Sequence, residues 1–497
     1  MAEYLLGLDI GTSTAHCVLT DTRLRPLAVI RAPMTYYTPP GCSSLAREFD
    51  PGAFMDLVGG LVAEAAKQER VAPGEIAAVG ITSQRQAVVF LDSEGNEVLC
   101  SHNLDMRAIF QGAAIDDEHG DEVYRLTGHF PSFMLAAARL RWLRETHHEA
   151  FRRLDCVLPL ASWLAYRLTG KLASEPAIDA EAGTLDISSP NRCATRKEIL
   201  GVDSSWLPTL HPAGTVVGEV TSEVTSWGLA AGTPVTIAGP DTQCALLAMG
   251  VVEPGQQAAV LGWSAAVQQV TAAPCLDLQK QTWAGYHPID GLWVAEANLG
   301  DLGHAHGWLK DLLLGVDTPF EHAEAMAASV APGADGVLAL LGAGPNTAPR
   351  AGLTTGGLLM PVPLAFQEAT AAQLLRAGLE SVAFSIKANR ITLERVAGQG
   401  AGFISVAGGM ASSPTLLQIL ADVLGMPVQC SSHPEATGRG AAAAAAMAAG
   451  MYSSLGEAVA GRCDPTVTYS PCPATAAEYV SHYDRWLETA QRVQQVG

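Results

Sequence analysis

The sequence predicts an α/β protein of two domains, each a mixed sheet flanked by helices. Short apolar runs that suit buried strands alternate along the chain with segments of helical periodicity. The length of 497 residues exceeds what one hydrophobic core organises. A strand, a glycine turn and a second strand occur at 5–19 and again at 257–270, which suggests two related domains.

Composition and charge exclude several kinds of binding partner and site. The net charge of −20 disfavours a nucleic-acid backbone or an anionic membrane as partner, because like charges repel. The ten cysteines include no C-x-x-C pair, a pattern typical of reduced thiols and not of a zinc site or a disulfide framework. No apolar run has the length of a membrane span, and the first residues lead directly into a strand. We therefore expect a cytoplasmic protein with no nucleic-acid and no membrane partner.

The first predicted strand, 5–10, ends in an acid and a glycine turn. Asp9 interrupts the apolar run, and Gly11, Thr12 and Ser13 form the turn before the second strand at 15–19. Glycine lets backbone amides approach an anion, hydroxyls add donors, and a carboxylate can hold a hydrated divalent cation. These features suit a nucleotide phosphate tail with Mg²⁺. They are equally consistent with an ordinary hairpin whose Asp9 caps the turn.

The remaining elements of the first half follow in order. A surface loop rich in Pro and Gly is expected at 36–50. The predicted strands are 76–81, 88–91 and a strand within 232–242 that ends at Asp241. The predicted helices are 54–68, 110–126, 137–153 and one that opens at 157–160 and stops at Gly170. We place the domain junction after the last strand, which gives domains 1–242 and 243–497.

The second half repeats the alternation. Its first strand, within 257–264, turns at Gly262, and a strand that begins at 403 turns at Gly408 and Gly409. The predicted helices are 374–387, 414–423, an alanine-rich run at 438–449 whose small side chains permit close packing, and a surface helix at 476–495.

Four glycine or acid turns at strand ends, with their order and spacing, resemble those of the FGGY carbohydrate kinases. Further matches are Leu140-x-Trp142-Leu143, the segment 179–184, Gly239-x-Asp241, and Ala407-Gly-Gly409 with the following 418–427, and this last stretch is the most specific. Within the family, 122–128 and 162–166 look most like autoinducer-2 kinases, whereas the general layout is equally that of xylulokinases. The resemblance covers nearly the whole chain. It implies two actin-like ATPase domains of the ribonuclease H-like type with a cleft between them.

The resemblance also implies a chemistry, the transfer of the γ-phosphoryl group of ATP to a sugar hydroxyl. It places the catalytic base at Asp241, although a carboxylate there could instead cap the following helix. Asp9 would hold Mg²⁺ through water. The residues that would contact ATP are Gly11, Thr12, Ser13, Gly262, Ser264, Gly408 and Gly409.

Sugar recognition is expected from five polar residues, because rejecting a wrong hydroxyl pattern needs paired hydrogen bonds. Arg85 and Gln86 stand where the family carries Met-His in xylulokinases and Arg-Glu in glycerol kinases, which leaves the substrate open. Asn103, Asp105 and Arg107 match the family's N-x-D-x-R segment; the alternative is a surface salt bridge of little energetic value.

The chain also departs from the family pattern. Trp263 replaces the usual Thr of the second phosphate loop and removes a hydroxyl donor. Met410 replaces the third glycine of the adenosine turn, and 342–350 replaces a G-E-R-x-P-like segment. Asp9 and Asp241 are both retained, which favours an active enzyme.

We therefore expect an ATP- and Mg²⁺-dependent kinase of a ketose such as xylulose, and leave open a homodimer. One alternative is a kinase of an autoinducer-2-type open-chain substrate. The other is a non-catalytic sugar- or nucleotide-binding protein of the same fold, which Trp263 favours. Sugar-dependent release of ADP would discriminate between a kinase and a binding protein.

Overall fold

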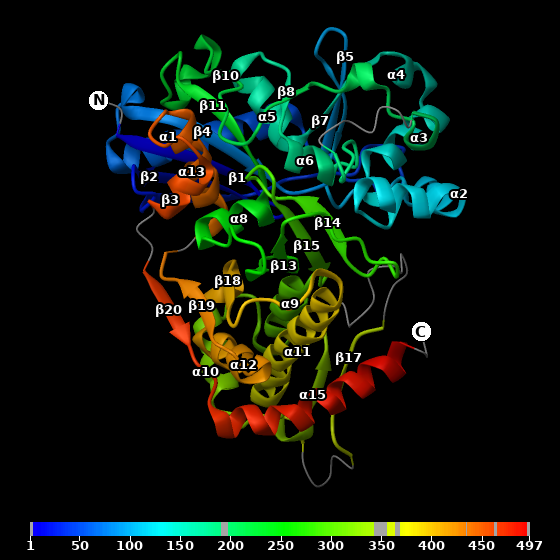
Figure 1. Ribbon diagram of the computed structural model, residues 1–497, viewed down its shortest axis with the longest axis vertical. Helices are drawn as coiled ribbons and strands as arrows, with labels where there is room; N and C mark the ends of the chain where they lie inside the picture. The colour runs from blue at the N-terminus through cyan, green and yellow to red at the C-terminus, as the bar shows by residue number, and fades with distance from the viewer. Residues whose placement is uncertain are drawn as a thin grey trace.

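Two large sheets, one above the other in Figure 1, organise the computed structural model, which describes residues 3–189, 197–341, 355–362, 368–433, 435–461 and 465–494. The upper sheet has six strands, in the order β10 (Gly218–Glu219), β11 (Pro234–Pro240), β4 (Ile76–Ser83), β1 (Tyr4–Ile10), β2 (Thr14–Asp21) and β3 (Pro26–Pro33). β1, β4 and β11 are parallel, and β2 and β3 continue from β1 as an antiparallel meander.

The lower sheet repeats this topology. Its order is β14 (Trp283–Tyr286), β15 (Trp293–Asn298), β13 (Ala265–Thr271), β12 (Gln257–Leu261), β18 (Ile404–Ala407), β19 (Val428–Ser431) and β20 (Thr466–Tyr469). β12, β18 and β19 are parallel, whereas β12, β13 and β15 form an antiparallel meander. The order β3-β2-β1-β4-β11 therefore recurs as β15-β13-β12-β18-β19. The predicted class of two domains with mixed sheets and flanking helices is confirmed.

The helices of the first half surround the upper sheet and a smaller one. They are α1 (Pro51–Glu69), α2 (Ile109–Thr127), α3 (Ala136–Thr146), α4 (His148–Arg152), α5 (Leu160–Thr169), α6 (Pro176–Glu181), α7 (Lys197–Leu200) and α8 (Asp241–Met249). The smaller sheet consists of β6 (Glu97–Ser101), β5 (Val88–Asp92) and β7 (Leu154–Pro159), and β8 (Ala173–Ser174) pairs with β9 (Thr209–Leu210).

Two predicted helices of this half were partly wrong. Residues 157–159 are the end of β7, which pairs with β5, and the helix α5 begins only at Leu160. The helix predicted over 137–153 is divided by His147, whose φ of −134° is not helical, into α3 and α4. Strand pairing with a distant segment outweighed the local pattern in the first case.

The second half has longer helices. They are α9 (Leu302–Leu314), α10 (Phe320–Ala328), α11 (Ala371–Ala397), α12 (Pro414–Leu424), α13 (Ala436–Ala448), α14 (Leu455–Ala460) and α15 (Pro473–Gln494), with a hairpin of β16 (Leu338–Leu340) and β17 (Gly357–Leu359). α11 begins at a capping box of Thr370 and Gln373 and is longer than predicted.

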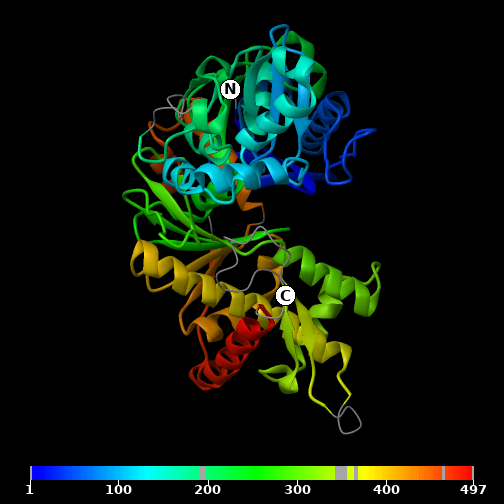
Figure 2. The same cartoon turned by 90° about the vertical axis from the view of Figure 1, so that its right-hand side faces the viewer.

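The C-terminal helix α15 lies beside α11 and α12 (red in Figures 1 and 2). We predicted a surface helix, but Tyr479, Tyr483 and Trp486 on one of its faces are buried in the core of the lower half. The indole of Trp486 also donates a hydrogen bond to the carbonyl of Ala339 on β16. The helix is therefore amphipathic and contributes to the core.

The alanine-rich helix α13 crosses back to the upper half, although β19 and β20 on either side of it belong to the lower sheet (Figure 1). Its backbone lies directly on the strands. A Cβ atom on Gly7 of β1 would be 1.9 Å from the carbonyl oxygen of Gly438, and one on Gly80 of β4 would be 1.9 Å from that of Ala441. The predicted domain boundary after residue 242 would place α13 in the second domain, although α13 covers the upper sheet of the first. The boundary therefore remains a prediction.

This close approach predicts a stability effect at Gly80. Gly80→Ala is expected to lower the free energy of unfolding by about 1–3 kcal/mol, because the added methyl group would collide with the backbone of α13. Urea titration followed by circular dichroism measures the change. The matched control is Gly60→Ala in α1, where no atom lies within 4 Å, and it should stabilise by about 0.5–1 kcal/mol. Equal effects of the two changes would contradict the close packing.

Two further expectations concern the described ranges alone. The helices there include none that combines the length and the apolar character needed to cross a bilayer. Six cysteines in these ranges are free thiols: Cys17, Cys42, Cys100, Cys244, Cys275 and Cys472.

Candidate functional site

The predicted base and the predicted cation ligand lie at the same edge of the upper sheet. Asp9 of β1 is in register with Thr82 of β4, and Thr82 is in register with Gly239 of β11. The Thr82 hydroxyl donates to the Gly239 carbonyl at 2.7 Å and ties the two strands together. Asp241 follows two residues later, at the first turn of α8. The carboxyl ends of the three parallel strands therefore bring both acids to one edge, the usual place for ligand binding in such sheets.

The Asp241 carboxylate does not cap the helix that follows it. Pro240 occupies the N-cap position of α8, and within the described ranges the Asp241 carboxylate accepts one hydrogen bond, from the Thr242 amide at 2.7 Å. Burial raises the pKa of Asp241 to about 6, although the nearby Arg85 guanidinium opposes this rise. A quarter of the side chain is exposed, so a ligand can reach it.

Arg85 joins the upper half to the lower sheet beside Asp241. Its Nη1 donates to both carboxylate oxygens of Glu296 on β15, at 2.8 and 2.7 Å. Its Nε lies 4.0 Å from Oδ1 of Asp241, and its Nη1 lies 3.7 Å from Oε2 of Glu181. The Arg85 side chain is only 8% exposed, so these contacts are largely shielded from water. The predicted sugar residue is thus the centre of a buried charge network.

Glu181 and its partners extend this network. Glu181 accepts a hydrogen bond from Nε2 of Gln243 at 2.9 Å and lies 3.1 Å from Nε2 of His129. Burial acts to raise the pKa of Glu181, but His129 and Arg85 hold it down to about 2. Gln268 on β13 donates to Glu296 at 2.7 Å. Sequence reasoning gave no site role to His129, Glu181 or Glu296, although Glu181 lies in the segment 179–184 that resembles the family.

Several of the buried side-chain amides that the structure describes have at least one polar atom without a protein partner. In the described part of the chain these are both amide atoms of Gln84, Nε2 of Gln86, Oε1 of Gln268 and Oδ1 of Asn103. A buried polar atom without a partner costs about 1–3 kcal/mol. A ligand that carries hydroxyl groups would supply both donors and acceptors to such amides.

Each of the two predicted phosphate loops is closed by a hydrogen bond from its glycine amide. In the first, the Gly11 amide donates to the Thr14 carbonyl at 3.1 Å; in the second, the Gly262 amide donates to the Ser264 carbonyl at 2.9 Å. Each loop joins two antiparallel strands, and both loops are partly exposed. The Trp263 ring stacks on His304 of α9, with ring centroids 5.0 Å apart and planes at 22°. Trp263, which stands where the family has Thr, therefore anchors the second loop on α9.

The predicted segment 103–107 divides into two environments. Asn103 donates to the Thr12 hydroxyl at 2.8 Å and thus contacts the first phosphate loop. Asp105 instead pairs with Arg107 at 2.8 Å, and Arg107 also pairs with Glu48 at 2.7 Å. The alternative of a surface salt bridge is wrong, because Asp105 is 1% exposed and Arg107 is 6% exposed. The described contacts do not join this pair to Asp241.

Gly408 and Gly409 form an exposed turn at the end of β18. Gly408 has a φ of 97°, and a Cβ atom there would lie 2.4 Å from the Leu261 carbonyl, so the position requires glycine. Met410, which replaces the family's third glycine, is buried in the core of the lower half. The other predicted departure, 342–350, lies outside the described residues.

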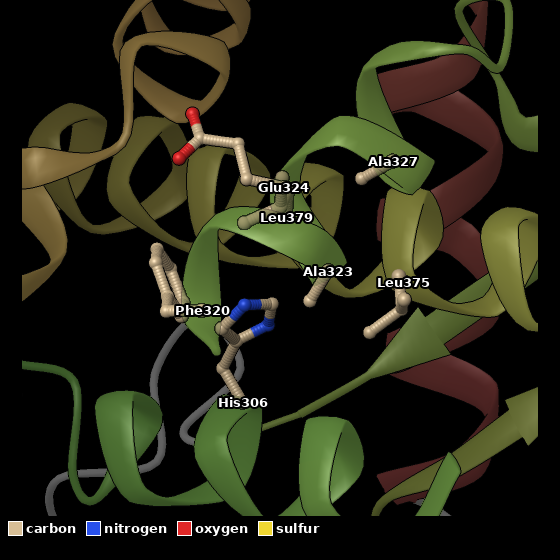
Figure 3. A pocket seen from close by; sticks show the side chains of 7 residues that line it. All are labelled: His306, Phe320, Ala323, Glu324, Ala327, Leu375 and Leu379. Carbon is tan, nitrogen blue, oxygen red and sulfur yellow. The ribbon is translucent and has the colours of Figure 1, made fainter. Parts of the chain in front are cut away.

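A small apolar pocket lies between α9, α10 and α11 (Figure 3). His306, Phe320 and Leu375 face the same space, whereas the Glu324 carboxylate points away from His306. Oε1 of Glu324 accepts from the Ser413 hydroxyl and the Thr415 amide, both at 2.9 Å. The pocket is thereby linked to the residues that follow the Gly408-Gly409 turn. Burial lowers the pKa of His306 to about 4, so its ring is neutral at pH 7.

Asp9 suits a cation. Burial raises its pKa to about 7; nearby His16 opposes the rise, and Asp241 adds to it. Its Oδ1 is buried without a hydrogen-bond partner in the described part of the chain. A carboxylate oxygen of this kind is a ligand that Mg²⁺ accepts, directly or through water.

Models of known protein families match nearly the whole chain. Residues 4–248 match the N-terminal domain of the FGGY family of carbohydrate kinases, and residues 258–449 match the C-terminal domain of that family. Among curated proteins, the autoinducer-2 kinase of Escherichia coli (strain K12) is 30% identical over 508 aligned residues, which cover 98% of this chain and 94% of that protein.

Solved structures give the same fold. The xylulose kinase from Rhodospirillum rubrum is 24% identical, with a TM-score of 0.82 and coverage of 99% of both chains. The gluconate kinase from Lactobacillus acidophilus is 19% identical, with a TM-score of 0.85 and coverage of 99% of this chain and 98% of that one.

Proposed function

The chain belongs to the FGGY family of carbohydrate kinases, and from this premise we propose that it phosphorylates a hydroxyl of a short, uncharged, open-chain sugar. The enzyme is a phosphotransferase with an alcohol acceptor, and ATP is its phosphoryl donor. The observation that carries the proposal is the position of Asp241 beside Arg85, at the sheet edge that also holds Asp9 and the first phosphate loop.

In the proposed mechanism Asp241 accepts the proton of the attacking hydroxyl. A pKa of about 6 leaves its carboxylate mostly ionised at pH 7 yet basic enough to take the proton. Arg85 would keep Asp241 in place, because its own side chain is fixed by Glu296. Asp9 would hold Mg²⁺, which neutralises phosphate charge when bound. The amides of the two glycine loops would contact the phosphates, and the Gly408-Gly409 turn the adenosine.

The charge balance of the site supports an uncharged substrate. Three carboxylates, those of Asp241, Glu181 and Glu296, lie around the Arg85 guanidinium, which is already paired with Glu296. His129 adds at most one further positive charge, beside Glu181. A carboxylate substrate such as gluconate would add a negative charge to this partly buried cluster, where Coulomb repulsion is strong. Both amide atoms of Gln84 and Nε2 of Gln86, which have no partner among the described residues, suit hydroxyl groups instead.

Two neutral substrates remain candidates. A ketose such as xylulose suits the general layout, but the solved xylulose kinase is too distant in sequence to support more than the fold. An autoinducer-2-type open-chain substrate is favoured by the curated relative, which aligns over 98% of this chain at 30% identity. Both carry the hydroxyl and carbonyl groups that the buried amides could bind.

A coupled assay of ADP release tests the proposal. The purified chain with ATP and Mg²⁺ is offered xylulose, other ketoses, pentitols, gluconate and the autoinducer-2 precursor. We expect one neutral compound to give strong turnover and gluconate to give little. Best turnover with gluconate would contradict the uncharged substrate. No turnover with any compound, with ATP binding intact, would favour the binding-protein alternative.

The pKa of Asp241 predicts an acid limb in the pH profile. Because the base must be ionised, kcat/KM should fall as the pH drops below about 6, about tenfold per pH unit once most of the carboxylate is protonated. Initial rates between pH 5 and pH 8, at saturating ATP and limiting sugar, would show the limb. A flat profile down to pH 5 would exclude a base with this pKa.

Trp263 offers a second kinetic test. Trp263→Thr restores the hydroxyl of the family's second phosphate loop, and a hydrogen bond to a charged phosphate contributes about 1.5 kcal/mol, roughly tenfold in kcat. We expect kcat to rise by about that factor in the ADP-release assay. An unchanged or lower kcat would mean that stacking on His304 is what the loop requires at this position.

A further inference from the structure

We propose that Asp9, His16 and Glu435 form a site that binds a divalent transition-metal ion in the absence of nucleotide and prefers it to Mg²⁺. The three side chains come from separate segments: Asp9 from β1, His16 from β2, and Glu435 from the residue before α13. The proposal rests on the proposed function, since Asp9 borders the proposed phosphate loop.

The fold holds the three ligands together. Asp9 and His16 are directly opposite each other in the antiparallel β1–β2 pair. Glu435 is brought to them because α13 packs on β1. Nδ1 of His16 lies 2.5 Å from Oε2 of Glu435 and 3.8 Å from Oδ2 of Asp9, and one ligand atom from each residue lies within 4.8 Å of the others.

Two observations point to a ligand at this place. Asp9 is only 7% exposed, yet its Oδ1 has no hydrogen-bond partner among the described residues. Burying a carboxylate oxygen in this way is unfavourable unless a cation or a donor compensates. In addition, Nε of Arg31 donates to Oε1 of Glu435 at 3.0 Å, which orients the carboxylate so that Oε2 faces His16. Outer partners of this kind fix the ligands of metal sites.

The donor set indicates the type of metal. An imidazole nitrogen with two carboxylates suits Mn²⁺, Fe²⁺, Co²⁺ or Zn²⁺, whereas Mg²⁺ prefers oxygen ligands and retains water. Two carboxylates and a neutral imidazole balance the charge of one divalent ion. Binding requires the Nδ1 lone pair of His16, so the proton that Nδ1 shares with Glu435 is released to solvent.

Electron paramagnetic resonance of Mn²⁺ tests the site on the full chain, treated with chelator and free of ATP. We expect one Mn²⁺ bound per chain, displaced by Zn²⁺ and retained in a large excess of Mg²⁺. His16→Gln and Glu435→Gln should each weaken binding at least about tenfold. The matched control is Asp21→Asn at the other end of β2, whose carboxylate pairs with Arg25, and it should bind Mn²⁺ as the wild type does.

The proposal is overturned if the chelator-treated wild type binds no Mn²⁺, if Mg²⁺ displaces it readily, or if both variants bind as the wild type does. ADP release with Mg²⁺ and ATP, measured on the same preparations, separates the two proposals. Turnover without Mn²⁺ binding would overturn the metal site alone. Mn²⁺ binding without turnover of any sugar would leave the metal site standing and contradict the proposed function.

Discussion

Asp241→Asn is expected to lower kcat for sugar-dependent ADP release by about 10²–10⁴-fold, because the amide cannot accept the proton of the attacking hydroxyl. Its shape is nearly that of the carboxylate, and the hydrogen bond from the Thr242 amide can still be accepted. ATP affinity should therefore change little. Steady-state kinetics measures the loss, and titration calorimetry measures the binding of ATP.

The matched control is Asp155→Asn, which removes an exposed carboxylate on β7. It should retain the kcat of the wild type. If Asp241→Asn also kept most of its turnover, the proton acceptor would have to be another group at the same sheet edge. A loss of ATP binding equal to the loss of kcat would instead assign Asp241 to nucleotide binding.

The second large effect concerns stability. Arg85→Met is expected to lower the free energy of unfolding by about 3–5 kcal/mol, because Glu296 would remain buried without its cation and Glu181 would keep only His129 as a cationic partner. Denaturant unfolding followed by tryptophan fluorescence measures the change. Arg25→Met, which breaks an exposed pair with Asp21, should cost about 1 kcal/mol or less.

A double variant distinguishes an unpaired charge from a loss of packing. In Arg85→Met with Glu296→Gln the side chain opposite the methionine is neutral, so much of the lost stability should return. The amide oxygen introduced by Glu296→Gln can still accept the hydrogen bond that Gln268 donates to the carboxylate in the wild type. If the double variant is as unstable as the single one, the Arg85 side chain stabilises the protein by packing alone.

The sequence predicted those parts of the site that are coded locally. The turns at Gly11 and Gly262 follow directly from a strand, a glycine and a second strand, and both have the predicted position. Asp241 was predicted as the base because an acid at a strand end is visible in the sequence and matches the family pattern, and this role stays a prediction. Glu296 was not found, since it reaches Arg85 across 211 residues and no local pattern marks such a contact.

Local patterns in the sequence also predicted the sheets of the fold, but not which helices cover them. The alternation of strands and helices and the recurring strand pair predicted two mixed sheets, and both sheets were found. The position of α13 was not predictable, because a run of alanines has no polar face that tells which sheet it covers. The buried face of α15 was missed for a related reason: three aromatic residues at helical spacing were interpreted as part of a surface helix.

The segment 103–107 gives a further example. Its residues were predicted together as sugar ligands, yet only Asn103 contacts a predicted ligand loop. Asp105 and Arg107 neutralise each other and hold Glu48 instead. Two charged side chains that are two residues apart can bind a ligand or pair with each other. Their spacing in the sequence does not decide between these outcomes. A role of Asp105 and Arg107 in sugar binding stays a prediction.

The most direct test of the proposed kinase is ³¹P NMR of the reaction of the chain with ATP, Mg²⁺ and the sugar that gives the highest rate of ADP release. We predict a new phosphomonoester resonance that grows together with ADP, and its absence in Asp241→Asn. Inorganic phosphate in place of the phosphomonoester would mean that the chain hydrolyses ATP and does not phosphorylate the sugar. That result would contradict a phosphoryl transfer in which Asp241 activates a sugar hydroxyl.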